Sequence, residues 1–327
     1  MITRKLTIGG VALGNNLALA PMAGVTNQAF RSLCIEGGAG LVVSEMVSAE
    51  SIRYGNKKSL KLLSISPSEH PIAMQLFGSD PESMARAAAL AQELGADIVD
   101  INAGCPVKKV LRSGSGAALM KDPARLEEII KRMVRAVTVP VTVKIRCGLT
   151  AGEVISPRLA RVIEGAGAAA ITLHARAAAD HHTGPIDHEA LAATAAAVKI
   201  PVFGNGGVRC AADAEKILAA GCVGVAVGRA AVENPSIFLE IAEGSSAPAR
   251  SDGRDHARRI KLFIRFLELN TALYGGDEGV VRARKLVGYW LKGFPNSSAL
   301  RGSFMKAAGL NEAKALLLQY TDSDCES

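Results

Sequence analysis

The most informative stretch of this chain is Asp100-Ile-Asn-Ala-Gly-Cys-Pro-Val-Lys-Lys-Val110. The apolar residues at its start are typical of a buried parallel strand. A glycine and a proline cannot continue a strand ladder, so we expect the strand to end near Asn102. Cys105 then lies at the carboxyl end of the strand, on a loop that carries basic residues. A lone cysteine is most often a small buried hydrophobe, but this position favours chemistry.

Outward from this stretch, residues 17–243 repeat one unit: a short apolar strand, a loop and an amphipathic helix. The expected strands are 17–20, 41–44, 72–77, 98–101, 141–145, 170–173, 202–203 and 223–227. The expected helices are 27–37, 81–94, 123–137, 157–165, 189–198, 211–220 and 235–243. Asp-Pro pairs at 80–81 and 122–123 are helix start signals. No clean helix is expected in 45–70.

Strands that alternate with helices in this way predict an α/β fold, a TIM (β/α)8 barrel over residues 1–243. A doubly wound open sheet is the alternative, but no G-x-G-x-x-G fingerprint follows an early strand. Residues 244–253 have the composition of a linker. Beyond them, apolar residues at helical spacing predict a small all-α bundle over 254–327.

Charge is concentrated in this second region. The chain carries 38 Lys and Arg against 31 Asp and Glu, a net charge of +7. Residues 254–314 alone contain 12 basic and 5 acidic side chains, so the excess lies in one segment. A segment of this kind suits a polyanionic partner.

Bulk properties exclude several other classes of protein. No apolar run reaches the ~18 residues of a membrane span, and no secretory leader is expected. The cysteines, at 34, 105, 147, 210, 222 and 325, form no C-x-x-C pair, which argues against an iron–sulfur or zinc site. Free thiols without a signal peptide fit a reducing cytoplasm. With no coiled-coil heptads, we expect a monomer.

Polar residues and glycines follow the predicted strands one after another. In a TIM barrel the active site is built from the loops at the carboxyl ends of the strands. The candidates there, in chain order, are Pro21, Met22, Ala23, Gln75, Asn102, Cys105, Lys144, His174, Arg176, Asn205, Gly206, Gly207, Gly228 and Arg229. Glycine-rich ends of the last two strands, each before a helix, are typical of a phosphate site in this fold.

Simpler explanations exist for some of these residues. His174 also fits a hydrogen-bonded core histidine, the glycines fit ordinary turns, and Arg229 fits a surface ion pair. Lys144 is harder to explain without a function, because an unpaired ammonium inside an apolar strand is costly. His181 and His182 resemble metal-ligand spacing, but no third ligand accompanies them, so no metal is expected.

Taken in order, these motifs resemble the signature set of tRNA-dihydrouridine synthases across residues 17–243. The matching segments are 21–26, 100–106 with 109–110, 143–146, 173–176, 204–207 and 228–230. In the tail, 284–286 and 289–295 resemble the bacterial B-type branch of the family. The Asn-x-Gly-Cys-Pro motif is highly specific to this family.

The resemblance implies an FMN-containing barrel with an appended helical domain that acts on tRNA, with NADPH or NADH as the reductant. The residues implied to hold the flavin are Pro21, Met22, Ala23, Gln75, Lys144, His174, Asn205, Gly206, Gly207, Gly228 and Arg229. Those implied to act on the substrate uracil are Cys105 as general acid, Lys144 and His174, with Asn102 and Arg176 as contacts.

These implied roles agree with the chemistry of uracil reduction. A hydride added at carbon 6 leaves negative charge that requires a proton at carbon 5. A free thiol is mostly protonated at neutral pH and can give that proton. Lys144 and His174 can stabilise the charge on the ring carbonyls. The target base must be unstacked, as with other enzymes that act on bases, and a basic domain would hold the RNA by its phosphates.

The chain departs from the family pattern after strand six. Where the family usually continues Thr-Arg, with an aromatic residue and a Trp further on, this chain has Ala177, Ala178, His182 and His188. The missing second arginine removes one expected RNA or phosphate contact. The flavin residues are untouched.

Three other functions were weighed against this one. A flavin reductase of a free pyrimidine, of the dihydroorotate type, would share the barrel, but a free base gives the basic segment no phosphates to bind. An RNA-binding protein without a cofactor would need neither Cys105 nor Lys144. An aldolase that uses Lys144 as a Schiff-base amine gives Cys105 no role.

Overall fold

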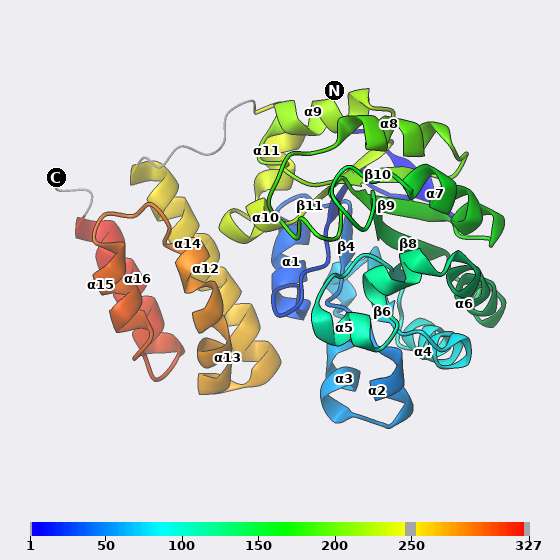
Figure 1. Ribbon diagram of the computed structural model, residues 1–327. Coiled ribbons are helices and arrows are strands. Elements are labelled where there is room, and N and C mark those ends of the chain that lie inside the picture. The colour runs from blue at the N-terminus through cyan, green and yellow to red at the C-terminus, as the bar shows by residue number, and fades with distance from the viewer. Residues whose placement is uncertain (1, 246–252, 324–327) are drawn as a thin grey trace.

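The computed structural model describes residues 2–245 and 253–323. A closed barrel of parallel strands forms the centre of one part, helices surround it, and a second, helical region packs beside it (Figure 1).

Within the described residues, eight parallel strands close the barrel. They are β3 (Leu17–Leu19), β4 (Leu41–Val43), β6 (Ile72–Phe77), β7 (Ile98–Asn102), β8 (Val141–Arg146), β9 (Ala170–His174), β10 (Val202–Asn205) and β11 (Gly224–Val227). The ring closes because β3 pairs with both β4 and β11, while β4 also pairs with β6. Each strand lies within two residues of its predicted position, so the predicted TIM barrel is confirmed.

The predicted outer helices are also present. They are α1 (Gln28–Glu36), α4 (Pro81–Glu93), α6 (Pro123–Ala136), α7 (Ser156–Gly165), α8 (His188–Ala196), α9 (Ala211–Ala219) and α11 (Ile237–Ala242). The side chains of Asp80 and Asp122 accept hydrogen bonds from backbone N–H groups at the starts of α4 and α6, as N-caps do.

Several short elements were not expected from the sequence. They are β1 (Leu6–Ile8), β2 (Val11–Leu13), β5 (Val47–Ser48), α2 (Ala49–Arg53), α3 (Lys57–Leu62), η1 (Pro67–Glu69), α5 (Lys108–Arg112), η2 (Gly116–Lys121) and α10 (Arg229–Glu233). The interval 45–70 therefore does contain helices. They are five and six residues long, too short to show a helical period in the sequence.

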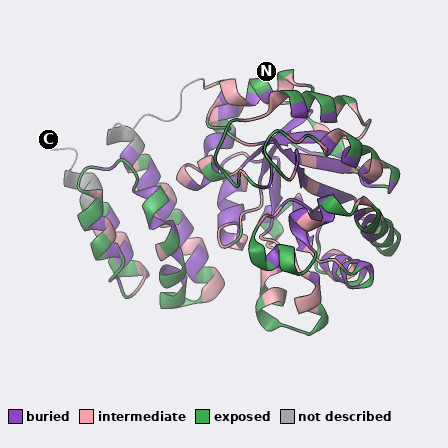
Figure 2. Cartoon of the chain, in the orientation of Figure 1, coloured by how far each residue is buried: buried purple, intermediate pink, exposed green. Residues whose placement is uncertain are grey.

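The barrel interior has an apolar layer at one end. Ile8 and Leu13 of the β1–β2 hairpin pack with Ile98, Phe203 and other inward-facing strand residues. Most residues of the barrel strands are buried (Figure 2). The hairpin fills one end of the barrel with apolar side chains, and the polar side chains gather toward the carboxyl ends of the strands.

The second region is all helical, as predicted. Its elements are α12 (Gly253–Tyr274), α13 (Gly276–Ala283), η3 (Arg284–Leu286), α14 (Val287–Trp290), α15 (Ser297–Phe304) and α16 (Leu310–Ser323). Its core is aromatic: the Trp290 ring lies 5.2 Å from that of Phe263 and 6.1 Å from that of Phe266. Most of the predicted linker, and residues 324–327 of the predicted bundle, lie outside the described residues.

Helix α12 packs on barrel helix α1. The Phe30 and Phe266 rings meet edge to face at 6.1 Å, and Asn27 Nδ2 donates to Asn270 Oδ1 at 2.8 Å. An exposed ion pair joins Arg265 to Glu36 at 2.7 Å. The helical region is therefore held on the barrel by specific contacts, polar and apolar.

A buried ion pair anchors the loop that follows β3. Arg31 Nε lies 2.5 Å from Glu69 Oε2, and both side chains are at most 1% exposed. The same guanidinium donates to the Thr26 carbonyl and to the Ser64 carbonyl, each at 2.9 Å. Burial raises the pKa of Glu69, and Arg31 opposes that rise. One side chain thus ties two loops together.

Arg31→Met should lower the free energy of unfolding by about 3–5 kcal/mol, because it leaves the Glu69 carboxylate buried without its partner. Urea denaturation of the wild type and the variant measures this difference. The matched control is Arg53→Met, which breaks an exposed pair with Glu50 and should cost less than about 1 kcal/mol. Equal losses in the two variants would contradict the anchoring role of Arg31.

Candidate active site

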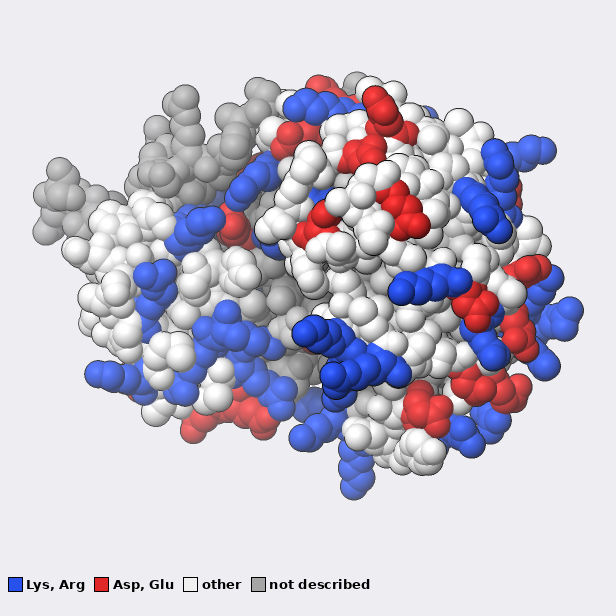
Figure 3. Space-filling view, viewed as in Figure 1, with Lys and Arg blue, Asp and Glu red and all other residues white. Residues whose placement is uncertain are grey.

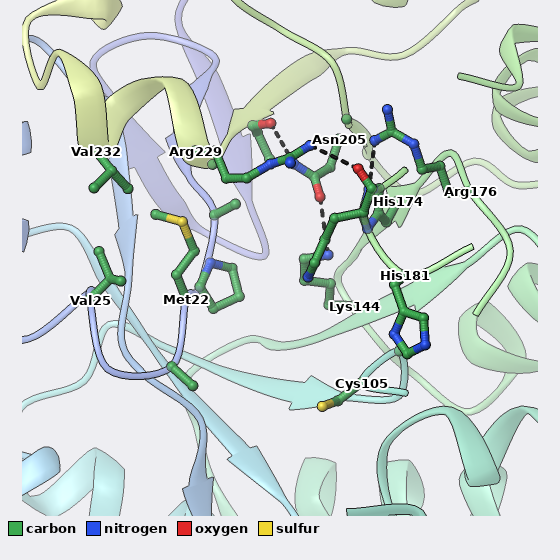
Figure 4. Close-up of a pocket in the computed structure, with 18 of the residues that line it drawn as sticks. Met22, Val25, Cys105, Lys144, His174, Arg176, His181, Asn205, Arg229 and Val232 are labelled. Carbon is green, nitrogen blue, oxygen red and sulfur yellow. Dashed lines mark hydrogen bonds between the residues drawn. The ribbon is translucent and has the colours of Figure 1, made fainter. Parts of the chain in front are cut away.

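A cavity of about 920 Å³ opens at the carboxyl ends of the barrel strands. It is lined by every candidate that sequence analysis selected: Pro21, Met22, Ala23, Gln75, Asn102, Cys105, Lys144, His174, Arg176, Asn205, Gly206, Gly207, Gly228 and Arg229. Figure 4 shows apolar Met22, Val25 and Val232 on one side, with Lys144, Cys105 and His174 on the other. The structure brings these residues together, and their individual roles stay predictions.

Strand register explains why the polar side chains meet. Residues paired across neighbouring parallel strands share one level of the barrel. Asn102 of β7 is the partner of Lys144 in β8, and Asn205 of β10 is the partner of His174 in β9. Four residues from four consecutive strands are thereby brought to the cavity end.

Lys144 is held inside the barrel by Asn205. Its Nζ donates to Asn205 Oδ1 at 3.2 Å, and Asn205 Nδ2 donates to the Ala226 carbonyl at 2.7 Å. Burial, with a smaller contribution from the positive charge of Arg146, lowers the pKa of Lys144 to about 8. The ammonium is therefore charged at neutral pH but can lose its proton within an ordinary working range.

His174 is a neutral imidazole in this site. Burial, followed by the positive charges of Lys144, Arg146 and Arg176, lowers its pKa far below the usual range of histidine. Arg176 Nη1 lies 3.4 Å from His174 Nε2. A guanidinium can only donate, so Nε2 is the acceptor and Nδ1 carries the proton. His174 can then donate one hydrogen bond without changing its charge.

The Cys105 loop is fixed from both sides. Asn102 Oδ1 accepts hydrogen bonds from the backbone N–H of Gly104 at 3.2 Å and of Cys105 at 3.0 Å. Arg146 Nε donates to the Gly104 carbonyl, and its Nη1 donates to the Ala177 carbonyl, each at 2.9 Å. The Cys105 side chain is half-buried at the edge of the cavity. A thiol with one defined position is what proton transfer to a bound substrate requires.

The glycine-rich end of the cavity has room only for backbone. Gly206 and Gly207 have φ of +126° and +72°, and a Cβ on either would come within 3.0 Å of the Ile186 side chain. Arg229 Nη2 donates to the His182 carbonyl at 3.0 Å and keeps its guanidinium at this end. Glycine backbone beside a guanidinium suits a phosphate group.

Among the cavity residues that were not selected as site candidates are His181, His182, Tyr289 and Lys292. His181 and His182 come from the loop after β9, and the His182 ring stacks on that of His174 with centroids 5.9 Å apart. Tyr289 and Lys292 reach the cavity from α14 and the turn after it, in the helical region. Their only sequence signal was the aromatic and basic run at 289–295.

Of the positions that depart from the family pattern, His182 lines the cavity. Ala177 and Ala178 are buried, His182 occupies the place opposite His174, and His188 begins α8. Across residues 2–245 and 253–323, no three His, Cys, Asp or Glu side chains group so that they could hold a metal ion. In the same residues, no helix combines the length and apolar character needed to cross a bilayer.

Known proteins resemble this chain along nearly its whole length. A family model described as dihydrouridine synthase (Dus) matches residues 18–324. The tRNA-dihydrouridine synthase B of Pseudomonas aeruginosa is 39% identical over 331 residues, which cover 98% of this chain and 93% of that protein. The tRNA-dihydrouridine synthase B of Pseudomonas putida is 41% identical, with 91% and 88% covered. A probable tRNA-dihydrouridine synthase of Rickettsia conorii is 37% identical, with 91% of each covered.

Solved structures share the fold at much lower identity. A morphinone reductase in complex with tetrahydroNAD superimposes with a TM-score of 0.56 at 15% identity, covering 76% of this chain and 92% of that one. The old yellow enzyme from Trypanosoma cruzi gives a TM-score of 0.55 at 13% identity, covering 77% and 94%. The likeness supports the barrel architecture alone.

Proposed function

We infer that this chain, which belongs to the dihydrouridine synthase family, is a flavin-dependent enzyme that reduces uridine in tRNA to 5,6-dihydrouridine. The observation that carries the inference is the meeting, in one cavity, of a half-buried thiol, a half-buried lysine and a glycine-rich end beside Arg229. The combination supplies a proton donor, a positive charge for a flavin or uracil ring, and a place for a phosphate.

The residues present fit a flavin mononucleotide. The cavity of about 920 Å³ is within the usual size of cofactor sites. The backbone at Gly206 and Gly207, where an added Cβ would collide with Ile186, stays free of side chains. Together with Arg229, it suits the single phosphate of FMN. Pro21, Met22 and Ala23 offer a wall for a planar ring, while Gln75 and Lys144 offer donors to its edge. FMN is therefore the flavin that we propose.

The bound flavin supplies a hydride to carbon 6 of the uracil, and NADPH is the reductant that we propose for it. Cys105 donates the proton that carbon 5 then needs. Lys144, charged at neutral pH, and the neutral His174 ring stabilise the negative charge that develops on the ring carbonyls. Asn102 and Arg176 line the cavity where the base enters and would orient it.

The helical region would bind the RNA by its phosphates. Lys and Arg side chains gather on its face and where it meets the barrel (Figure 3). Lys61 of the barrel and Arg282 of the helical region lie over the same Tyr274 ring, at 4.6 Å and 4.3 Å from its centroid. Basic side chains from both parts therefore meet at the junction, and Lys292, which pairs with Glu233 at 3.3 Å, lines the cavity. We propose a monomer in the cytoplasm, the compartment where a tRNA substrate and free thiols are compatible.

The decisive experiment incubates tRNA that lacks dihydrouridine with the protein, FMN and NADPH, and maps dihydrouridine by position. We expect dihydrouridine at one or more D-loop positions, and release of FMN from the denatured protein. A flavin-loaded protein that reduces a free pyrimidine but leaves tRNA unchanged would contradict the proposal and favour the dihydroorotate-type alternative.

A further inference from the structure

Asp100 is a buried carboxylate to which the proposed chemistry gives no part. It lies in the middle of β7, is 4% exposed, and faces the barrel interior beneath the cavity. Its register partners are Gln75 in β6 and Thr142 in β8. Both bond to it: Gln75 Nε2 lies 2.7 Å from one carboxylate oxygen, and Thr142 Oγ1 lies 2.6 Å from the other.

Hydrogen bonds continue from Asp100 to the Cys105 loop. Asn102 Nδ2 donates to Gln75 Oε1 at 2.8 Å. Asn102 Oδ1 in turn accepts the backbone N–H of Gly104 and of Cys105. The chain of contacts therefore runs from the carboxylate through two side-chain amides to the loop that carries the thiol.

The direction of each amide in this relay can be deduced. Backbone N–H groups only donate, so the Asn102 oxygen must face them and its nitrogen must face Gln75. The Gln75 oxygen then faces Asn102, and its nitrogen faces Asp100. An acceptor is needed at that point, and the carboxylate oxygen provides it. Burial raises the pKa of Asp100, while the bonds from Gln75 and Thr142 and the charge of Lys144 oppose that rise.

We propose that Asp100 is a positioning residue: as the acceptor at the end of the relay, it fixes the amide orientation of Gln75 toward the flavin and, through Asn102, the place of Cys105. The proposal rests on the proposed function in two respects only: that the cofactor is a flavin, and that Cys105 donates a proton to the substrate. Without an acceptor at position 100, the Gln75 nitrogen has no partner on that side, and the hydrogen bond from Asn102 Nδ2 alone holds the amide.

The test compares three variants in the full chain. Asp100→Leu removes the acceptor at nearly constant volume. Asp100→Asn keeps an oxygen for Gln75 and can turn its nitrogen to the Thr142 hydroxyl, so it should preserve the relay. Thr142→Val removes the other hydrogen bond to the same carboxylate and leaves the relay intact. It is the matched control for a loss of buried polar contacts alone.

Two measurements are made on flavin-free protein, neither of which uses tRNA. Fluorescence titration with FMN gives the flavin affinity, and iodoacetamide labelling, mapped by peptide mass spectrometry, gives the alkylation rate at Cys105. For Asp100→Leu we expect the FMN affinity to fall roughly tenfold, the effect of one lost hydrogen bond, and Cys105 alkylation to accelerate. Asp100→Asn and Thr142→Val should stay within about twofold of the wild type.

Near-ultraviolet circular dichroism identifies variants that do not fold. If Asp100→Leu fails that check, Asp100→Ser carries the same expectation, because its shorter hydroxyl no longer reaches Gln75. A folded Leu or Ser variant with wild-type FMN affinity and wild-type Cys105 alkylation overturns the proposal, as does an equal effect in Thr142→Val. A wild type that forms no dihydrouridine in tRNA would instead contradict the proposed function and leave this result standing.

Discussion

Replacing Cys105 with alanine should reduce dihydrouridine formation by about 10²- to 10⁴-fold, the usual contribution of a positioned general acid. The loop around Cys105 is held by Asn102 and Arg146, so the smaller side chain should leave the cavity unchanged. What is lost is the proton for carbon 5 of the uracil. Hydride transfer then has no partner to neutralise the charge that it creates.

The measurement is single-turnover formation of dihydrouridine in tRNA by flavin that has already been reduced. Reduction of the flavin by NADPH, followed by its absorbance in the absence of tRNA, should stay near the wild-type rate because it needs no thiol. Cys147→Ala is the control: this buried cysteine lies three residues beyond the cavity-lining Lys144 but does not line the cavity. If both alanine variants lose the same activity, Cys105 is not the acid.

Lys144→Met should lower turnover by about 10²-fold or more, since it removes a preorganised positive charge from the site where negative charge develops. The effect should depend on pH in a defined direction. Burial holds the pKa of Lys144 at about 8, so the wild type keeps this charge below that pH and loses it as the pH rises through it. The wild-type rate should therefore fall on the alkaline side, and the variant should lack this part of the fall.

The measurement is single-turnover formation of dihydrouridine by flavin that has already been reduced, because the charge that Lys144 is proposed to stabilise develops in that step. The rate of this step is followed from one pH unit below the Lys144 pKa to one unit above, at equal flavin loading. His174 contributes nothing to this profile, since its pKa lies far below the range. Lys121→Met, a substitution on the exposed surface, serves as the control. An alkaline fall that persists unchanged in Lys144→Met would show that another group titrates.

The barrel could be predicted because its signals are local. Each strand is a short apolar run, and buried parallel strands need no alternating pattern. The N-caps at Asp80 and Asp122 marked two helices directly. Site candidates followed from one topological fact, that the carboxyl ends of barrel strands share a face. The same logic placed Cys105, from β7, and Arg229, from the end of β11, at one cavity.

What escaped prediction depends on contacts between distant residues. The approach of Tyr289 and Lys292 to the cavity is set by the packing of α12 on α1, which no local pattern encodes. The role that we propose for Asp100 depends on strand register. Gln75 and Thr142 can bond to its carboxylate only because they are its partners in the neighbouring strands. The helices α2 and α3 were too short to recognise.

The contact between α1 and α12 fixes the position of the helical region relative to the cavity. Asn27, which caps α1 and ends the turn after Met22, also bonds Asn270 of α12. The distance between the basic surface that we propose to bind the RNA and the cavity that we propose to receive one base is therefore set by this packing. On this proposal, a folded RNA held by the helical region would present to the cavity the nucleotide that lies at that distance. Selection by distance needs no recognition of the neighbouring sequence.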